Sequence, residues 1–131
     1  KLDCGLVLVE NRDEVSVQAL NDVCTFSFSK FLEHNNLKKK ADLETFSLSV
    51  IPRNYNYRNL LDKKYRFYEV SIDNWWSIYG YTSFTNRHIF ISSNDFKATF
   101  GHEIYHALSY LYGIDVGEEA AYEFEKKYFR K

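Results

Sequence analysis

The sequence predicts an α+β fold, because two different spacings of apolar residues occur in separate parts of the chain. Apolar residues recur every three to five positions over 13–34, which is typical of a helix with one buried face. Residues 45–50 and 88–92 alternate between apolar and polar, as strands with one buried face do. Helical spacing returns over 100–112 and 118–129. We therefore expect an N-terminal helix, a small antiparallel or mixed sheet of three or four strands, and two C-terminal helices.

The first part of the chain is expected to form one helix and two strands. Residues 6–9 are a short apolar run that predicts either a first strand or a segment docked on the core. The helix over 13–34 contains no Gly or Pro that would interrupt it. The basic triplet at 38–40 predicts a solvated turn, and the strand over 45–50 is expected to end at Pro52.

The middle of the chain is expected to supply the remaining strands. Residues 53–64 are polar and rich in Asn and Tyr, which predicts a long connection. Residues 65–72 and 75–84 have the composition of strands, and Asp73-Asn74 predicts a turn between them. A second turn at Thr85-Asn86 precedes the strand over 88–92.

Glycines mark the ends of the two C-terminal helices. Gly113 is placed to end the helix over 100–112, and Gly117 directly precedes the helix over 118–129. The sequence contains no repeat, low-complexity tract or linker, so residues 1–131 are expected to form a single domain.

Composition excludes several classes of protein. The chain of 131 residues is 45% hydrophobic and 27% charged, as in ordinary globular proteins and unlike disordered chains. The net charge of −1 lacks the basic excess of a dedicated nucleic-acid binder. No run approaches 18 apolar residues, so no transmembrane helix is expected. We expect a monomer that acts on peptide or protein partners.

Two features bear on the compartment in which the protein works. The sequence begins at Lys1 and contains no Met, which predicts a processed or trimmed chain. Cys4 and Cys24 are either one disulfide or two buried thiols, and the sequence leaves both open. Together they favour a secreted or extracytoplasmic protein.

One motif indicates chemistry: His102-Glu103-Ile104-Tyr105-His106 matches H-E-x-x-H. Histidines at i and i+4 lie on one face of a helix, where both rings reach a single metal ion. Zinc suits neutral imidazole and keeps an open position for water at a catalytic site. Glu103 lies about 100° around the helix and is therefore beside the water rather than among the ligands. There it can accept a proton as a general base.

The chain here resembles the zincin metallopeptidases, and specifically their gluzincin branch. The resemblance covers roughly residues 88–125 and is carried by two motifs. The first is H-E-x-x-H. The second is Glu118-Glu119-Ala120-Ala121-Tyr122-Glu123-Phe124, which is similar to the E-x-x-A-x-x-F pattern in the ligand helix of minimal gluzincins. It implies that His102, His106 and Glu118 bind Zn²⁺ and that Glu103 is the catalytic base. It also implies a minimal zincin-like domain with an active-site helix and a C-terminal ligand helix.

The choice of the third ligand stays open between two glutamates. Helical geometry places Glu118 and Glu125 at the edge of the buried face, while Glu119 and Glu123 point largely to solvent. Only eleven residues separate His106 from Glu118, and a tight helical hairpin would favour Glu125. The resemblance favours Glu118.

A transition-state donor is also expected, because a developing oxyanion needs a hydrogen-bond donor. Tyr110, Tyr112 and Tyr122 are the candidates, and Tyr110 lies on the same helical side as Glu103. We therefore take Tyr110 as the second catalytic residue. His34 and His88 are isolated and are expected to be structural or surface residues.

The sequence thus predicts a zinc-dependent metalloendopeptidase in which an extended substrate pairs with the strand over 88–92. One alternative is a catalytically silent binding or regulatory module of zincin fold. Another is a structural protein in which the histidine pair is coincidental.

Overall fold

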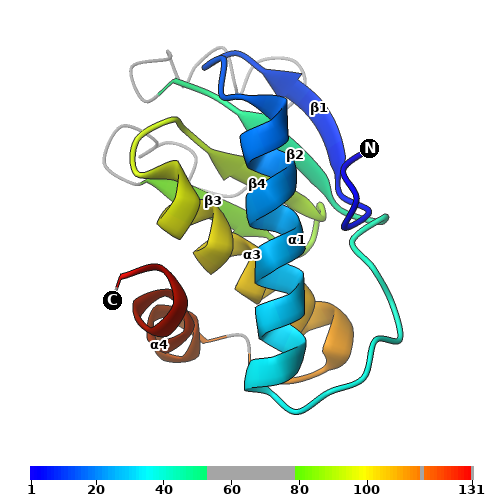
Figure 1. Cartoon of the computed structure of the whole chain (residues 1–131). Helices are drawn as coiled ribbons and strands as arrows, with labels where there is room; N and C mark the ends of the chain where they lie inside the picture. The colour runs from blue at the N-terminus through cyan, green and yellow to red at the C-terminus, as the bar shows by residue number, and fades with distance from the viewer. Residues whose placement is uncertain (53–78, 116, 131) are drawn as a thin grey trace.

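The computed structural model describes residues 1–52, 79–115 and 117–130, and these residues form a small mixed α+β fold (Figure 1). In chain order the described elements are β1 (Val7–Asn11), α1 (Val17–His34), β2 (Ser47–Val50), β3 (Gly80–Ser83), β4 (His88–Ile91), α3 (Phe96–Tyr112) and α4 (Glu118–Phe129). The predicted α+β class is therefore confirmed. Part of the prediction lies outside the described residues. This part is the strand over 65–72, the turn at Asp73-Asn74 and the first part of the strand over 75–84.

The sheet is mixed, with strand order β1-β2-β4-β3. Among the described strands, β1 and β2 are parallel, β2 and β4 are parallel, and β3 and β4 are antiparallel. An all-antiparallel sheet is therefore the wrong alternative. Two parallel strands need a long crossover, and α1 supplies it between β1 and β2. The short turn at 84–87 instead joins β3 to β4 as a hairpin.

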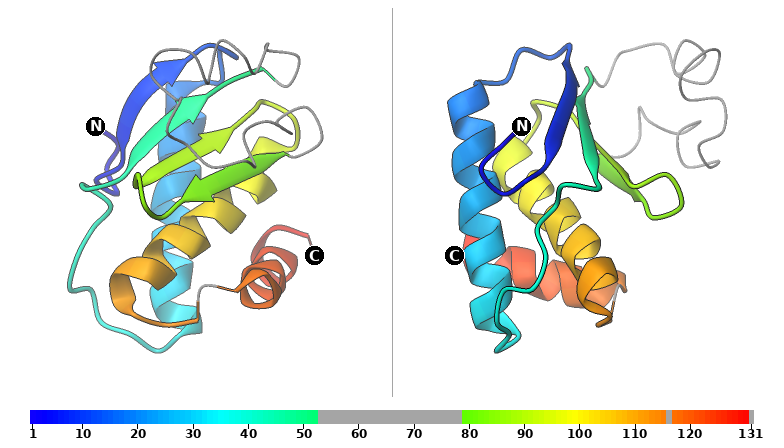
Figure 2. Two further views of the ribbon diagram at one scale, coloured as in Figure 1. Left: turned by 180° about the vertical axis from the view of Figure 1, so that it is seen from behind. Right: turned by 90° about the vertical axis from the view of Figure 1, so that its right-hand side faces the viewer.

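The helices α1 and α3 cover one face of the sheet, and α4 packs against α3 (Figures 1 and 2). The core lies between this face and the two helices. Its largest fully buried side chains include Leu20 and Phe31 of α1, Leu48 of β2 and Phe100 of α3. These residues hold α3 rigidly against the sheet, and α3 carries the H-E-x-x-H motif.

The N-terminal segment is tied to α1 by hydrogen bonds and a disulfide. The amide side chain of Asn11 bonds both the backbone N–H and the carbonyl of Val15, and Ser16 caps the helix by accepting from the N–H of Ala19. The helix therefore begins at Val17, four residues later than expected. Cys4 and Cys24 form a disulfide, which answers the question that the sequence left open.

The two C-terminal helices end as the glycines predict. Gly113 adopts a left-handed conformation with φ of 67° after α3, and Gly117 directly precedes α4. α3 begins at Phe96, four residues earlier than expected, after Asp95. Among the described residues, no helix is both long and apolar enough to cross a membrane.

Candidate metal centre

Two buried histidines of α3 point their rings toward the same place. His102 and His106 are one helical turn apart, and their Nε2 atoms are 3.2 Å from each other. The other side of this part of α3 is fixed in the core by Ile104 and Leu108, both fully buried. The helix therefore presents the two imidazoles together and holds them in place.

A carboxylate from α4 completes the cluster. Glu118 is the first residue of α4, and the connection from Gly113 to Gly117 returns the chain so that this residue meets the imidazoles. Its Oε1 is 2.5 Å from Nε2 of His106, and its Oε2 is 3.3 Å from Nε2 of His102. The Glu118 side chain is 66% exposed, whereas both histidines are buried. The structure thus brings together the three residues expected to bind metal.

The three side chains are grouped closely enough to hold a metal ion. Ligand atoms of His102, His106 and Glu118 all lie within 4.8 Å of one another. Zinc–nitrogen bonds of about 2.0–2.1 Å in a tetrahedron place ligand atoms about 3.3 Å apart. The distances of 3.2 Å between the histidines and 3.3 Å from His102 to Glu118 are close to this value, whereas the distance of 2.5 Å from His106 to Glu118 is shorter. Two imidazoles and a carboxylate are a donor set that zinc accepts, and three such ligands would leave a fourth position for water.

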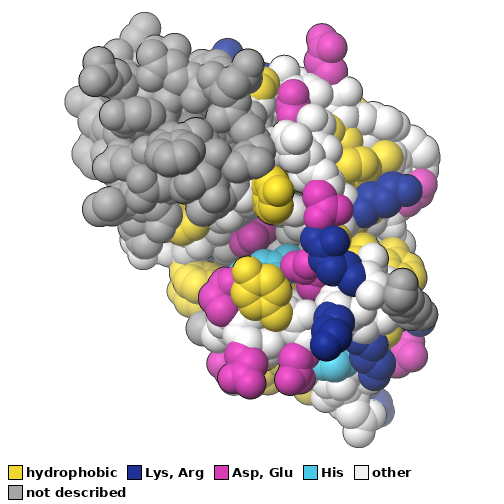
Figure 3. Space-filling model, turned by 90° about the vertical axis from the view of Figure 1, so that its left-hand side faces the viewer, with side chains coloured by type: hydrophobic (Ala, Val, Ile, Leu, Met, Phe, Trp, Pro, Cys, Tyr) yellow, Lys and Arg dark blue, Asp and Glu magenta, His cyan; other side chains and the backbone are white. Residues whose placement is uncertain are grey.

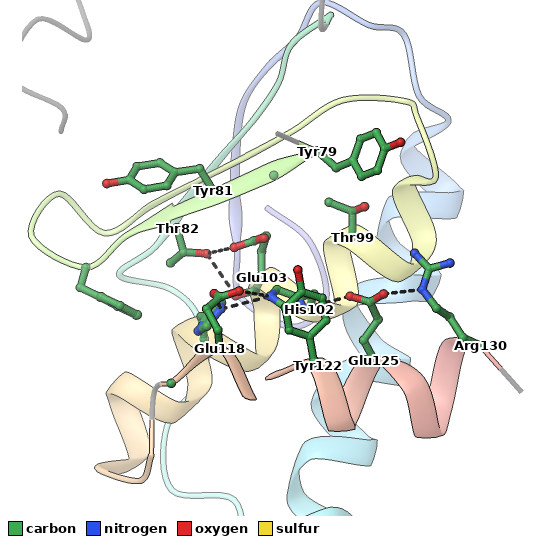
Figure 4. A pocket seen from close by; sticks show the side chains of 14 residues that line it. Tyr79, Tyr81, Thr82, Thr99, His102, Glu103, Glu118, Tyr122, Glu125 and Arg130 are labelled. Carbon is green, nitrogen blue, oxygen red and sulfur yellow. Dashed lines mark hydrogen bonds and ion pairs between the residues drawn. The ribbon is translucent and has the colours of Figure 1, made fainter. Parts of the chain in front are cut away.

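Glu125 lies beside the cluster but on the far side of His102. Its Oε1 accepts a hydrogen bond from Nδ1 of His102 at 2.9 Å, so it bonds the ring nitrogen that faces away from the other ligands (Figure 4). Its other oxygen accepts from Nε of Arg130, whose guanidinium also bonds Asp95. Of the two glutamates left open by the sequence, Glu118 and not Glu125 is grouped with both histidines. Glu125 instead orients the ring of His102.

Glu103 is buried next to the histidines and has one side-chain donor among the described residues. Oγ1 of Thr82 in β3 donates to Oε1 of Glu103 at 2.7 Å. Burial raises the pKa of Glu103 to about 8, and the charges of Glu118 and Glu125 add to the rise, while the hydrogen bond from Thr82 opposes it. The carboxyl group is therefore oriented by the strand and has a strong tendency to take up a proton.

β3 can lie this close to α3 because it begins with a glycine. A Cβ atom on Gly80 would be 2.7 Å from Cγ2 of Thr99 and 3.1 Å from both Cγ and Oε2 of Glu103. Real Cβ atoms do not come so close without displacing a neighbour. Gly80 therefore permits the approach of the strand that brings Thr82 to Glu103.

A cavity of about 790 Å³ opens onto the cluster between β3, α3 and α4 (Figure 4). This volume suits a small ligand or a segment of peptide. On the face of the molecule shown in Figure 3, acidic and hydrophobic side chains gather around a recessed histidine. The described lining residues are Tyr79, Gly80, Tyr81, Thr82, Phe84, Thr99, His102, Glu103, His106, Gly117, Glu118, Tyr122, Glu125 and Arg130.

Tyr110 is not among these lining residues. Its ring stacks on Phe84 with centroids 5.4 Å apart, and the guanidinium of Arg87 lies over it at 5.4 Å. Of the other two candidate tyrosines, Tyr112 donates its hydroxyl hydrogen to the carbonyl of Ala41. Tyr122 does line the cavity, with its ring centroid 4.8 Å from that of His102. The geometry therefore favours Tyr122 over Tyr110 for contact with a ligand.

The two isolated histidines lie away from the cluster. His88 is buried and hydrogen-bonded to Ser49 at 2.7 Å. His34 packs edge-on against Tyr105, Phe124 and Tyr128. Neither lines the cavity, in agreement with their expected structural role.

Sequence reasoning missed Thr82, Gly80, Arg130 and Asp95. The first two lie near Glu103 only because β3 is packed against α3 in one register, and the last two meet only because α4 ends near the start of α3. No short motif carries this information. Gly80, which lies inside the strand predicted over 75–84, was the one available signal, since a Gly within a strand indicates a close approach of another group.

No protein-family model, curated protein or solved structure matches the chain.

Proposed function

We propose that the protein is a zinc-dependent metalloendopeptidase of zincin-like fold, with Glu103 as general base. One observation carries this proposal: two imidazoles and a carboxylate converge closely enough to hold a metal ion, and a buried glutamate lies beside them in an open cavity. His102, His106 and Glu118 would hold the ion. Zinc held there supplies a Lewis acid that polarises a peptide carbonyl and activates a water molecule.

The protein side chains have distinct tasks in this proposal. Glu103 accepts the proton of the attacking water and returns it to the leaving amine. Thr82 holds its carboxyl group toward the cavity through the hydrogen bond to Oε1. For the developing oxyanion we favour a donor that lines the cavity, and Tyr122 meets this condition where Tyr110 does not.

The substrate is proposed to lie along β3. The sequence favoured pairing with the strand over 88–92, but β4 lies between β2 and β3 and is not an outer strand. Among the strands that the structure describes, β3 is the last in the order on this side, and Gly80, Tyr81 and Thr82 all line the cavity. An extended peptide placed there would run past Glu103 and the metal ligands.

The decisive experiment compares the protein with its Glu103→Gln variant. Zinc content is measured by mass spectrometry, and cleavage is measured on a mixture of unstructured peptides of random sequence. The variant is expected to keep zinc and lose cleavage by at least about 1,000-fold, since the base is removed and the ligands remain. Glu119→Gln, on the exposed face of α4, is the control and should cleave normally.

Each other outcome has a clear meaning. Unchanged cleavage in Glu103→Gln would contradict the role of the base. A zinc-loaded wild-type protein that cleaves nothing would indicate the silent binding or regulatory module instead. A zinc-free protein would leave only a structural role for the cluster.

The setting is proposed to be secreted or extracytoplasmic. The disulfide between Cys4 and Cys24 supports this, because disulfides persist in oxidising compartments. A monomer acting on peptides, without nucleic-acid partners, remains the expectation from composition.

A further inference from the structure

We propose that Arg130 and Asp95 are positioning residues for the metal centre: they hold Glu125 in the orientation that aims Nε2 of His102 at the ion. This inference rests on the proposed zinc site. It assigns a task in metal binding to a residue that follows α4 and to one that precedes α3.

Both oxygens of Glu125 have a partner. Oε1 accepts from Nδ1 of His102 at 2.9 Å, and Oε2 accepts from Nε of Arg130. The Glu125 side chain is only 10% exposed, so water cannot readily replace a lost partner. The carboxylate is therefore held between the imidazole and the guanidinium, and neither oxygen is turned toward Glu118.

This arrangement selects one tautomer of His102 when an ion is bound. A carboxylate accepts but does not donate, so the bond to Glu125 places a hydrogen on Nδ1, whereas Oε2 of Glu118 at 3.3 Å draws a hydrogen to Nε2 as long as no ion lies between them. An ion bound there would take the lone pair of Nε2, and the bond to Glu125 would then keep the hydrogen on Nδ1. A metal-binding imidazole needs this form, and its outer hydrogen bond maintains it.

Arg130 is itself held by the start of α3. Its Nη2 donates to Oδ2 of Asp95, while its Nε donates to Glu125 (Figure 4). The bridge thus links the beginning of the helix that carries both histidines to the end of the helix that carries Glu118. It restrains rotation of α4 about its axis, and such rotation would move Glu118 and Glu125 together.

The exposure of these groups argues that the bridge acts on the site more than on overall stability. The side chains of Arg130 and Asp95 are 46% and 45% exposed, and ion pairs so accessible to water stabilise a fold weakly. Arg130 is also the one Lys or Arg among the described residues that line the cavity, whose lining includes the carboxylates of Glu103, Glu118 and Glu125. Its removal would leave a buried carboxylate oxygen without its donor.

The test is a set of zinc dissociation constants, measured by competition with a chelator. Arg130→Ala is expected to weaken zinc binding about 10-fold, the lower end of what loss of an outer hydrogen bond costs. Arg130→Lys should recover part of the loss, and Lys126→Ala, an exposed cation of the same helix, should bind zinc normally. In the Glu125→Ala background, Arg130→Ala should have no further effect, because the carboxylate through which it acts is gone.

A second measurement does not depend on zinc. The ¹⁵N chemical shifts of the imidazole nitrogens are measured on the metal-free Glu118→Ala protein, in which this carboxylate no longer competes for a hydrogen on Nε2. They should show His102 with its hydrogen on Nδ1, and a mixture of tautomers once Arg130→Ala is added. Unchanged zinc affinity in folded Arg130→Ala, or losses that add with Glu125→Ala, would overturn the inference. If the wild type binds no zinc the proposed function fails, and an unchanged tautomer when Arg130→Ala is added would then overturn this inference separately. Should Arg130→Ala not fold, Arg130→Lys and Asp95→Asn take its place in both measurements.

Discussion

Glu103 and Glu125 are both buried beside His102, yet their partners differ. Glu103 is bonded by a neutral hydroxyl, that of Thr82, and burial raises its pKa to about 8. Glu125 is bonded by the imidazole and by the guanidinium of Arg130. A carboxyl group without a cationic partner can gain and lose a proton, whereas one paired with a cation serves as a fixed acceptor. The roles that we propose, base for Glu103 and positioning residue for Glu125, therefore agree with the neighbours of each carboxyl group.

Thr82 provides a test at the scale of one hydrogen bond. Thr82→Val keeps the shape of the side chain but removes the donor to Oε1 of Glu103. We expect kcat for peptide hydrolysis to fall about 10-fold with little change in KM, since a hydrogen bond to a charged group contributes about 1.5 kcal/mol or more. Thr82→Ser should retain most of the activity. Equal losses in the two variants would show that the methyl group matters and the hydroxyl does not.

At the scale of elements, the position of β3 against α3 determines whether strand and motif meet. β3 comes closest to α3 at Gly80, where a Cβ atom would not fit beside Thr99 and Glu103. The hydrogen bond from Thr82 follows two residues later on the same strand. A displacement of β3 would therefore change the cavity wall and the surroundings of Glu103 together.

Gly80→Ala is expected to produce this displacement. The added Cβ would meet Cγ2 of Thr99 at 2.7 Å, and such overpacking destabilises a fold by about 1–3 kcal/mol. Urea denaturation would measure the loss in the free energy of unfolding. Thr99→Ser removes the contacting methyl group, so the double variant should recover part of the stability. If the double variant is no more stable than Gly80→Ala, the strain does not arise at the contact with Thr99.

The helices were predictable from the sequence and the pairing of strands was not. The apolar spacing of α3 and the glycines at 113 and 117 are local signals, and they gave correct helix ends where they applied. The i, i+4 spacing of His102 and His106 is equally local. Strand partners depend instead on residues far apart in the chain, and the parallel pairing of β1 with β2 was missed although a helix-length connection joins them. Thr82 and Arg130 were missed for the same reason, since their partners are 21 and 35 residues away.

For the molecule as a whole, the disulfide is the one covalent tie between the N-terminal segment and the helical layer in the part of the chain described. Cys4 precedes β1 and Cys24 lies in α1, 20 residues along the chain. The proposed metal centre is built from α3 and α4. The disulfide and the proposed metal centre therefore lie in different parts of the fold.

Replacing both cysteines with serine should separate stability from metal binding. Opening a loop of this length is expected to lower the free energy of unfolding by about 3 kcal/mol, while the zinc dissociation constant stays unchanged. Chemical denaturation and chelator competition on the same preparations would measure both. A variant as stable as the wild type, or one that binds zinc more weakly while still folded, would contradict this separation.

The uneven exposure of the three ligands has a consequence for the rate at which metal is exchanged. His102 and His106 are buried and held by α3, but the side chain of Glu118 is 66% exposed at the first position of α4. The ligand that can leave first is therefore the carboxylate, and its departure opens the ion to solvent while the imidazoles still hold it. A small chelator reaching the site from this side would form a transient ternary complex, so zinc loss should accelerate with chelator concentration instead of proceeding at one fixed rate.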